Sequence, residues 1–146
     1  ETISSLYWDD TEPTDSVFTV GTQARVNASG GTYVAYLFAH DTGDDSVVQC
    51  GSYTGNASAT GPVVTLGWEP QWLLIKSSSA SDDWYLLDAA RGAFDYYLKP
   101  HAADVEDTGA GNLVDVSSTG FQIKSTNSNI NRGSSTLVYV AIRAEA

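Results

Sequence analysis

Residues 32–40 read Thr-Tyr-Val-Ala-Tyr-Leu-Phe-Ala-His, a run rich in β-branched and aromatic side chains between a Ser-Gly-Gly turn and an acidic turn. Its length and its glycine-containing flanks favour a strand over a helix. Both faces of such a strand would be apolar, with Val34, Tyr36 and Phe38 on one of them. We therefore predict a strand at residues 32–39 that is covered on both faces, by its own domain or by another copy of the chain.

Outward from this stretch, the chain alternates between short apolar segments and turns rich in Gly, Ser, Asn and Asp. Further strands are expected at residues 16–20, 46–54, 63–66, 71–76, 84–88, 113–116, 121–125 and 136–142. The segment at residues 71–76 is again apolar on both faces, and it is expected to pair with residues 84–88 as a hairpin. No sustained 3.6-residue period predicts a helix longer than about two turns. The pattern predicts an all-β fold, an antiparallel, jelly-roll-like β-sandwich with short helical turns at most. Residues 1–15 are expected to form an arm or linker, and residues 16–146 a single β-sandwich domain.

Composition limits the function classes. The 146 residues are enough for one domain with its own core. The chain contains 7 Lys and Arg residues and 18 Asp and Glu residues, which gives a formal net charge of −11. This charge would repel a phosphate backbone, so no nucleic-acid partner is expected. No apolar run approaches the roughly 18 to 20 residues that span a bilayer, so no membrane insertion is expected. The lone cysteine, Cys50, permits no internal disulfide and alternates like a packed residue. The chain lacks Met, which favours a segment of a longer polypeptide.

Residues that could carry catalysis are few. The two histidines, His40 and His101, accompany no Gly-x-Ser-x-Gly motif, so a hydrolytic triad is not expected. Asp82 and Asp83 beside Trp84 form the acid–aromatic cluster that a glycosidase would use, or a ligand-binding or receptor-binding loop. A solvated hairpin tip explains the same residues, and we predict no catalytic residues and no enzyme. The four tryptophans could stack on sugar rings, but core or interface positions are the expectation.

A calcium site is the alternative considered for the acidic turn after residue 40. Asp41, Asp44 and Asp45 offer carboxylate oxygens on a glycine-containing loop. The EF-hand spacing of acids is absent, so the sequence predicts no metal and no cofactor, with Ca²⁺ as the one candidate.

The order of several segments resembles a known family. The resemblance runs through residues 32–39, 50–56, 61–64, 67–76, 84–88, 120–123 and 139–144. These segments resemble an uncharacterised domain near the C-terminal ends of bacteriophage tail and tail-fibre proteins, notably those of marine and cyanobacterial phages. The resemblance implies a virion protein at the particle surface, the C-terminal part of a longer virion polypeptide. That family has no assigned catalytic residues, so none is transferred.

The resemblance leads to one expected function and two alternatives. The expected function is a structural and adhesive module of a tail fibre or tail appendage, which presents loops to a host surface glycan or protein. The alternatives are a capsid-decorating or other structural virion protein without receptor contact, and a glycan-binding or glycan-degrading tailspike domain. Phage fibres resembling this one are commonly trimeric, so a homo-oligomer, most often a trimer, is expected beside other virion proteins. Tyr36 or Trp72 is expected at or near the interface.

Overall fold

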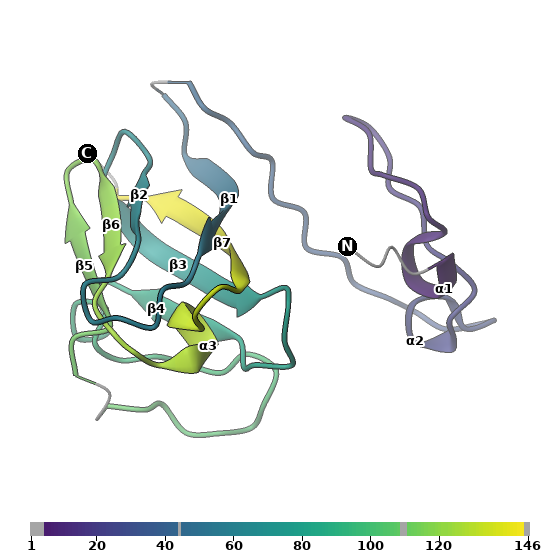
Figure 1. Ribbon diagram of the computed structural model, residues 1–146. Coiled ribbons are helices and arrows are strands. Elements are labelled where there is room, and N and C mark those ends of the chain that lie inside the picture. Colours follow the sequence, from purple (N-terminus) through teal and green to yellow (C-terminus); the bar gives the residue numbers. More distant parts are fainter. Residues whose placement is uncertain (1–4, 44, 109–110, 145–146) are drawn as a thin grey trace. The chain divides into compact units, whose positions relative to one another are not determined.

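The structure is a computed structural model that describes residues 5–43, 45–108 and 111–144 (Figure 1). The chain divides into two compact units, Glu1–Leu37 and Phe38–Ala146. The sequence placed the start of the β domain at Ser16, whereas the division in the structure follows Leu37.

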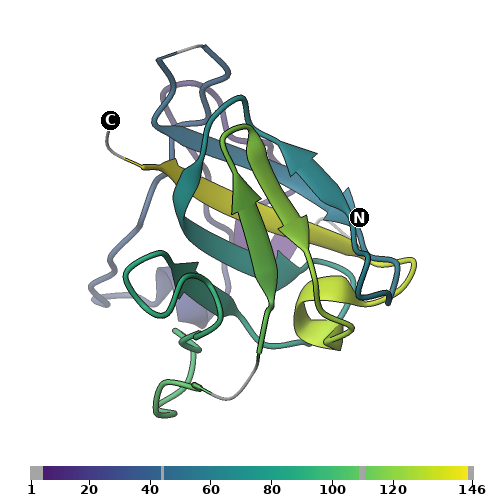
Figure 2. The same ribbon diagram turned by 90° about the vertical axis from the view of Figure 1, so that its left-hand side faces the viewer.

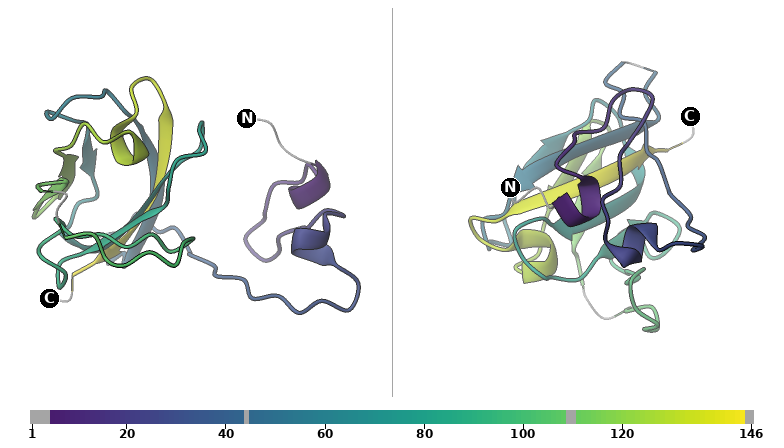
Figure 3. Two further views of the ribbon diagram at one scale, coloured as in Figure 1. Left: turned by 90° about the horizontal axis from the view of Figure 1, so that it is seen from below. Right: turned by 90° about the vertical axis from the view of Figure 1, so that its right-hand side faces the viewer.

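The first unit contains two short helices, α1 (Ser5–Trp8) and α2 (Ala24–Asn27), which Figure 3 shows with the loop that joins them. Gly21 ties the segment before α2 to α1, because its N–H donates to the carbonyl oxygen of Tyr7 at 2.7 Å. The strand predicted for residues 16–20 does not form. Among the described residues of this unit only Gly21 is buried, so residues 5–37 contain no apolar core of their own.

The strand predicted for residues 32–39 does not form either, and this central prediction is wrong. The segment, which we call the connector, is an irregular connection whose residues are all exposed (Figure 1). Its backbone makes no hydrogen bond to another described residue. The side chains of Val34, Tyr36 and Leu37 are 79%, 84% and 76% exposed. A strand requires a neighbouring strand edge as its partner, and residue composition contains no information about where that edge lies.

The second unit is built from two antiparallel sheets that face each other (Figure 2). The four-stranded sheet contains, in spatial order, β1 (Val48–Thr54), β7 (Thr136–Arg143), β3 (Pro70–Ser77) and β4 (Tyr85–Asp88). The three-stranded sheet contains β2 (Val63–Thr65), β6 (Gly120–Ile123) and β5 (Val114–Ser117). The predicted all-β antiparallel sandwich is confirmed, and so is the hairpin of β3 with β4.

Helices are short throughout the described part of the chain. The third, α3 (Ser128–Asn131), lies between β6 and β7, and each of the three has four residues. This confirms the expectation of no helix longer than two turns. Within residues 5–43, 45–108 and 111–144, no helix has the length and apolar character needed to cross a membrane.

The core lies between the two sheets and follows from the period-two alternation of their strands. The four-stranded sheet contributes Tyr53, Leu73, Ile75, Tyr85, Leu87, Leu137, Tyr139 and Ala141. The three-stranded sheet contributes Val64, Val114, Phe121 and Ile123. Phe121 stands edge-on to both Tyr53 and Tyr139, so one aromatic group links the two layers.

A buried polar residue, Asn131 at the end of α3, joins three loops at one end of the sandwich. Its side chain is fully buried. Its amide nitrogen donates to the carbonyl oxygens of Ser58 and Ser125, each at 2.8 Å, and its amide oxygen accepts from the backbone N–H of Asn56 at 2.8 Å. The sequence predicted only a polar loop here, because Asn, Ser and Gly dominate its composition.

Hydrogen exchange should separate the sandwich from the connector. The amides of β3 and β7 are expected to exchange slowest, since each of these strands is hydrogen-bonded to a strand on both sides. In a single copy, at a dilution that separates the chains, the amides of residues 33–39 are expected to exchange at rates close to those of an unfolded chain. Mass spectrometry of deuterated peptides measures both. Slow exchange across the connector would contradict the prediction unless it disappeared on dilution.

Candidate functional site

The outward side of the four-stranded sheet is apolar. The strand registers align Cys50, Val140, Leu74 and Leu86 in one row across all four strands, and Val48, Ile142 and Trp72 in the next. These seven side chains, together with Val138, form what we call the apolar face. All are partly buried except Val138, which is 39% exposed. The charged residues that share this side of the sheet are Lys76 and Asp88, one of each sign.

The three-stranded sheet has the opposite character on its outward side. Alternation places Val63, Thr65, Asp115, Ser117 and Gln122 there, so one apolar side chain stands among four polar ones. A sheet face that meets water is usually polar, as this one is. The contrast marks the apolar face as the surface of the sandwich that is suited to being covered.

The apolar face already carries one side chain from outside the sheet. The ring of Phe38 stacks on Trp72 of β3, with 6.3 Å between the ring centroids and 26° between the planes. Phe38 is the first residue of the second unit and belongs to the connector. The sequence missed this contact, because the two residues lie far apart along the chain and no local pattern relates them.

Cys50 lies within the apolar face on β1. Partial burial raises the pKa of its thiol above the usual value. The protonated thiol is a poor nucleophile, so Cys50 acts here as a small apolar side chain, which agrees with the expectation from its alternation.

The acidic pair before β4 is fixed by cations. Asp82 forms a two-pronged ion pair with Arg132, in which the Nε–Oδ2 distance is 2.8 Å. Asp83 pairs with Lys99 at 3.1 Å and with His101 at 3.2 Å. The bond from Arg132 lowers the pKa of Asp82, and the bond from Lys99, with the charges of Lys99 and His101, lowers that of Asp83.

The ion pairs of Asp82 and Asp83 can be compared with what a glycosidase would require of these two acids. A glycosidase needs one carboxylic acid whose pKa is raised so that it can donate a proton near neutral pH. Both Asp82 and Asp83 have lowered pKa values and remain charged. Trp84, which follows them, is 38% exposed. The arrangement suits a fixed contact loop better than a proton donor.

The ion pair of Asp82 should make a small, pH-dependent contribution to stability. Since the pKa of Asp82 is lowered in the folded state, the stabilisation is present above the ordinary carboxyl pKa and is lost as the pH falls through the lowered value. Asp82→Asn is expected to reduce the free energy of unfolding by about 0.5–1 kcal/mol at pH 7, and by less at acid pH. Urea unfolding of both proteins across pH checks this. A difference that does not change with pH would contradict it.

In the acidic turn after residue 40, the two described candidate acids, Asp41 and Asp45, belong to no metal cluster of described residues. The carboxylate of Asp41 accepts the backbone N–H of Gly43 at 2.9 Å, as in a turn, and Asp45 is exposed. Asp44 lies outside the described residues. In the part of the chain that the structure describes, no three His, Cys, Asp or Glu side chains come together as a metal site.

The histidines occupy unrelated places in the second unit. His40 is exposed, and its Nδ1 accepts the backbone N–H of Cys50 at 3.1 Å. His101 pairs with Asp83. Among the described residues, neither histidine is hydrogen-bonded to a serine, threonine or cysteine side chain, which is the contact that nucleophilic catalysis requires.

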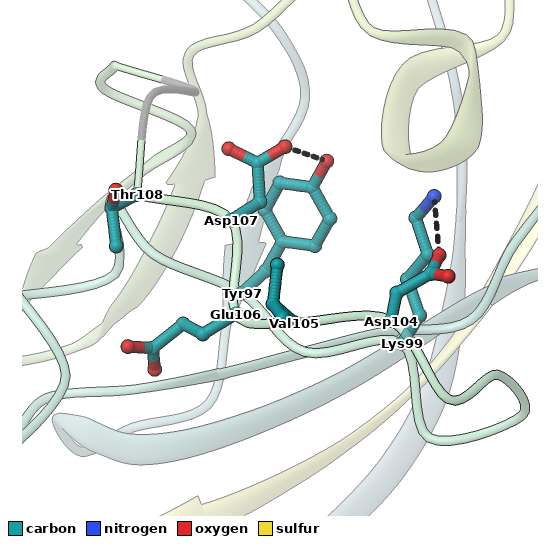
Figure 4. A pocket seen from close by; sticks show the side chains of 7 residues that line it. All are labelled: Tyr97, Lys99, Asp104, Val105, Glu106, Asp107 and Thr108. Carbon is teal, nitrogen blue, oxygen red and sulfur yellow. Dashed lines mark hydrogen bonds and ion pairs between the residues drawn. The ribbon is translucent and has the colours of Figure 1, made fainter.

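A shallow pocket of about 370 Å³ lies beside the segment that precedes β5 (Figure 4). Its walls are formed by Tyr97, Lys99, Asp104, Val105, Glu106, Asp107 and Thr108. The carboxylates in its wall already have partners: Asp104 pairs with Lys99 at 3.3 Å, and Asp107 accepts the Tyr97 hydroxyl at 2.7 Å. Glu106 is likewise bound to Arg91. These contacts organise the pocket wall rather than leaving ligands for an ion.

Comparison with known protein families matches residues 1–146 to a family described as a domain of unknown function, DUF7483. The chain belongs to the DUF7483 family. No curated protein and no solved structure matches it. What can be inferred about the function of this DUF7483 domain therefore comes from its own surfaces.

The candidate residues of this DUF7483 domain are only partly brought together. Asp82, Asp83 and Trp84 lie on one loop, as expected, and the structure adds the cations that hold the two acids. Of the two residues expected near an interface, Trp72 lies on the apolar face and Tyr36 lies in the exposed connector.

Proposed function

We propose that this chain is a structural and adhesive module of a bacteriophage tail fibre or tail appendage, located at the particle surface and working as a homo-oligomer, most often a trimer. It needs no catalytic residue and no cofactor. The resemblance of its segments to phage tail domains supports the location. The apolar face supports assembly, whether with copies of the chain or beside other virion proteins.

The observation that carries the proposal is the difference between the two outward sheet faces. Seven partly buried apolar side chains and Val138 share one face, and polar side chains dominate the other. An apolar patch of this kind on a folded domain marks an interaction site. A module packed into a larger assembly through one face and exposed to water on the other would have this distribution.

The adhesive part of the proposal rests on the loop that precedes β4. The Asp82 and Asp83 carboxylates are held by cations, and the backbone N–H of Asp83 is fixed by the Asn129 side chain at 2.8 Å. Trp84 is exposed beside them. A rigid loop with an exposed aromatic ring and charged groups can bind a glycan or protein surface without paying much ordering entropy.

Immunogold electron microscopy tests the location. Antibodies raised against the purified chain would be applied to phage particles whose genome encodes it. Gold at the tail fibres or tail tip is the expected result. Gold at the capsid surface would favour the capsid-decorating alternative, and particles that carry no gold would overturn the virion proposal.

An activity assay tests the non-enzymatic part. The purified chain is expected to release no reducing ends from envelope polysaccharide of the phage's host. Release that is lost in Asp82→Asn or Asp83→Asn would support the glycan-degrading alternative and overturn this part of the proposal.

A further inference from the structure

We propose that the connector of one copy lies on the apolar face of a second copy. This inference rests on the homo-oligomeric state proposed above and names the two surfaces that form it. The connector supplies Val34, Tyr36 and Leu37, and the second copy supplies the rows of apolar side chains beside its own Phe38–Trp72 pair.

The first argument is that the connector has apolar side chains without cover. Tyr36 is 84% exposed, and Val34 and Leu37 are nearly as exposed. Single exposed apolar residues are common on protein surfaces, but three within four positions form a continuous apolar strip. The backbone of this strip also makes no hydrogen bond to another described residue. Both its side chains and its backbone are therefore available to a partner.

The second argument is that the chain itself shows how a connector residue binds the apolar face. Phe38 stacks on Trp72, with the ring centroids 6.3 Å apart. Tyr36 is of the same class and lies two positions earlier in the sequence. The apolar face extends from Trp72 across β7 to β1, and these strands offer Val140 and Cys50 in the row beside it.

The third argument is electrostatic. The chain carries a formal net charge of −11, so two copies repel each other wherever their acidic loops approach. Residues 32–39 contain no charged side chain. The sheet side that bears the apolar face carries one Lys and one Asp, which balance. A contact between these two surfaces brings copies together where the repulsion is weakest.

The length of the connector agrees with the width of the sheet. The six connector residues that precede Phe38 reach about 20 Å when extended, and the four strands of the sheet are about 14 Å across from first axis to last. Both surfaces occur on every copy, so each copy can give its connector and receive another. Such a head-to-tail contact closes as a ring where the rotation between copies allows it, and a reciprocal exchange closes as a dimer. If the partner were a protein of another sequence, the match between the connector and the apolar face of the same chain would have no explanation.

Light scattering on the 146-residue chain tests the inference. The unaltered chain is expected to be oligomeric at micromolar concentration, and Tyr36→Ser with Leu37→Ser is expected to weaken assembly at least 100-fold in dissociation constant. The matched control is Val63→Ser with Val105→Ser, which removes two exposed apolar residues elsewhere, 68% and 89% exposed. The control is expected to assemble like the unaltered chain.

Cross-linking identifies the receiving surface. A photoreactive phenylalanine derivative in place of Tyr36, in a mixture of ¹⁴N- and ¹⁵N-labelled chains, is expected to give mixed-isotope cross-links to peptides of β3 or β7. Cross-links confined to one chain would overturn the inference.

The outcomes separate this inference from the proposed function. If the unaltered chain is an oligomer that both double variants preserve, the connector contact is excluded while the homo-oligomer stands. If the unaltered chain is a monomer, both the contact and the homo-oligomer are excluded. The location in the virion is decided separately, by the gold labelling.

Discussion

Replacing Asn131 with alanine is expected to lower the free energy of unfolding by about 2–4 kcal/mol. The side chain is fully buried and serves as donor to Ser58 and Ser125 and as acceptor from Asn56. Alanine leaves these backbone groups without their partner inside the protein, and each buried polar group left unsatisfied costs about 1–3 kcal/mol. Partial access of water to the exposed Asn56 limits the total.

Two further variants separate hydrogen bonding from packing. Asn131→Asp keeps the shape and the acceptor oxygen but replaces the donor with a charged oxygen that faces two carbonyl groups, so it should destabilise at least as much as alanine at pH 7. Asn112→Ala is the control, because Asn112 is exposed and its side chain bonds only Asp115 among the described residues. The control should stay within about 0.5 kcal/mol of the unaltered chain.

Urea unfolding followed by tryptophan fluorescence measures these differences, since Trp68 is buried in the core. The prediction fails if Asn131→Ala and Asn112→Ala have equal midpoints. It also fails if Asn131→Asp is as stable as the unaltered chain, because the amide donor would then contribute nothing.

The strands that were predicted correctly are those whose pattern is local. The β3–β4 hairpin is an example, because a polar loop separates two apolar segments that pair directly along the chain. The order of the strands in the four-stranded sheet was not predicted. There β7 lies between β1 and β3, a placement set by contacts between distant residues that no local period encodes.

The connector and α3 show two opposite errors of prediction from local sequence: a strand expected where none forms, and a polar loop expected where buried residues lie. The connector has the composition of a strand, but no described residue pairs with its backbone, so the prediction of a strand failed. The segment around α3 has the composition of a loop, yet it buries Ile130 and Asn131 completely. In both cases tertiary contacts, or their absence, outweigh residue preference.

For the candidate site, too, only the local features were predicted from the sequence. That Asp82, Asp83 and Trp84 share a loop follows directly from their positions in the sequence. Their electrostatic state does not, because Arg132, which holds Asp82, is 50 residues away. The apolar face was foreseen only as the double-sided apolar character of residues 71–75. Its extent became clear from the registers that align β3 with β7 and β1.

Gly120→Ala is expected to destabilise the sandwich by about 3 kcal/mol or more. Gly120 begins β6 with a φ of +151°, a conformation that is essentially restricted to glycine and costs other residues about 1–3 kcal/mol. A Cβ at this position would also overlap the carbonyl oxygen of Val64 on β2 and approach the backbone nitrogen of Leu66 at 3.2 Å. Since both neighbours are backbone atoms, β2 would have to move away from β6.

The matched control is Gly133→Ala, whose Cβ would lie 3.4 Å from that of Ala57, an ordinary contact. It should change stability by less than about 1 kcal/mol, and a gain is acceptable because alanine restricts the unfolded chain. Urea unfolding compares the two variants. If Gly120→Ala does not fold, its loss of the β-sheet circular dichroism signal beside a folded Gly133→Ala supports the prediction equally. Equal stability of the two variants would show that β2 and β6 can separate at little cost, and the close approach of Gly120 to Val64 would then have no part in holding the three-stranded sheet together.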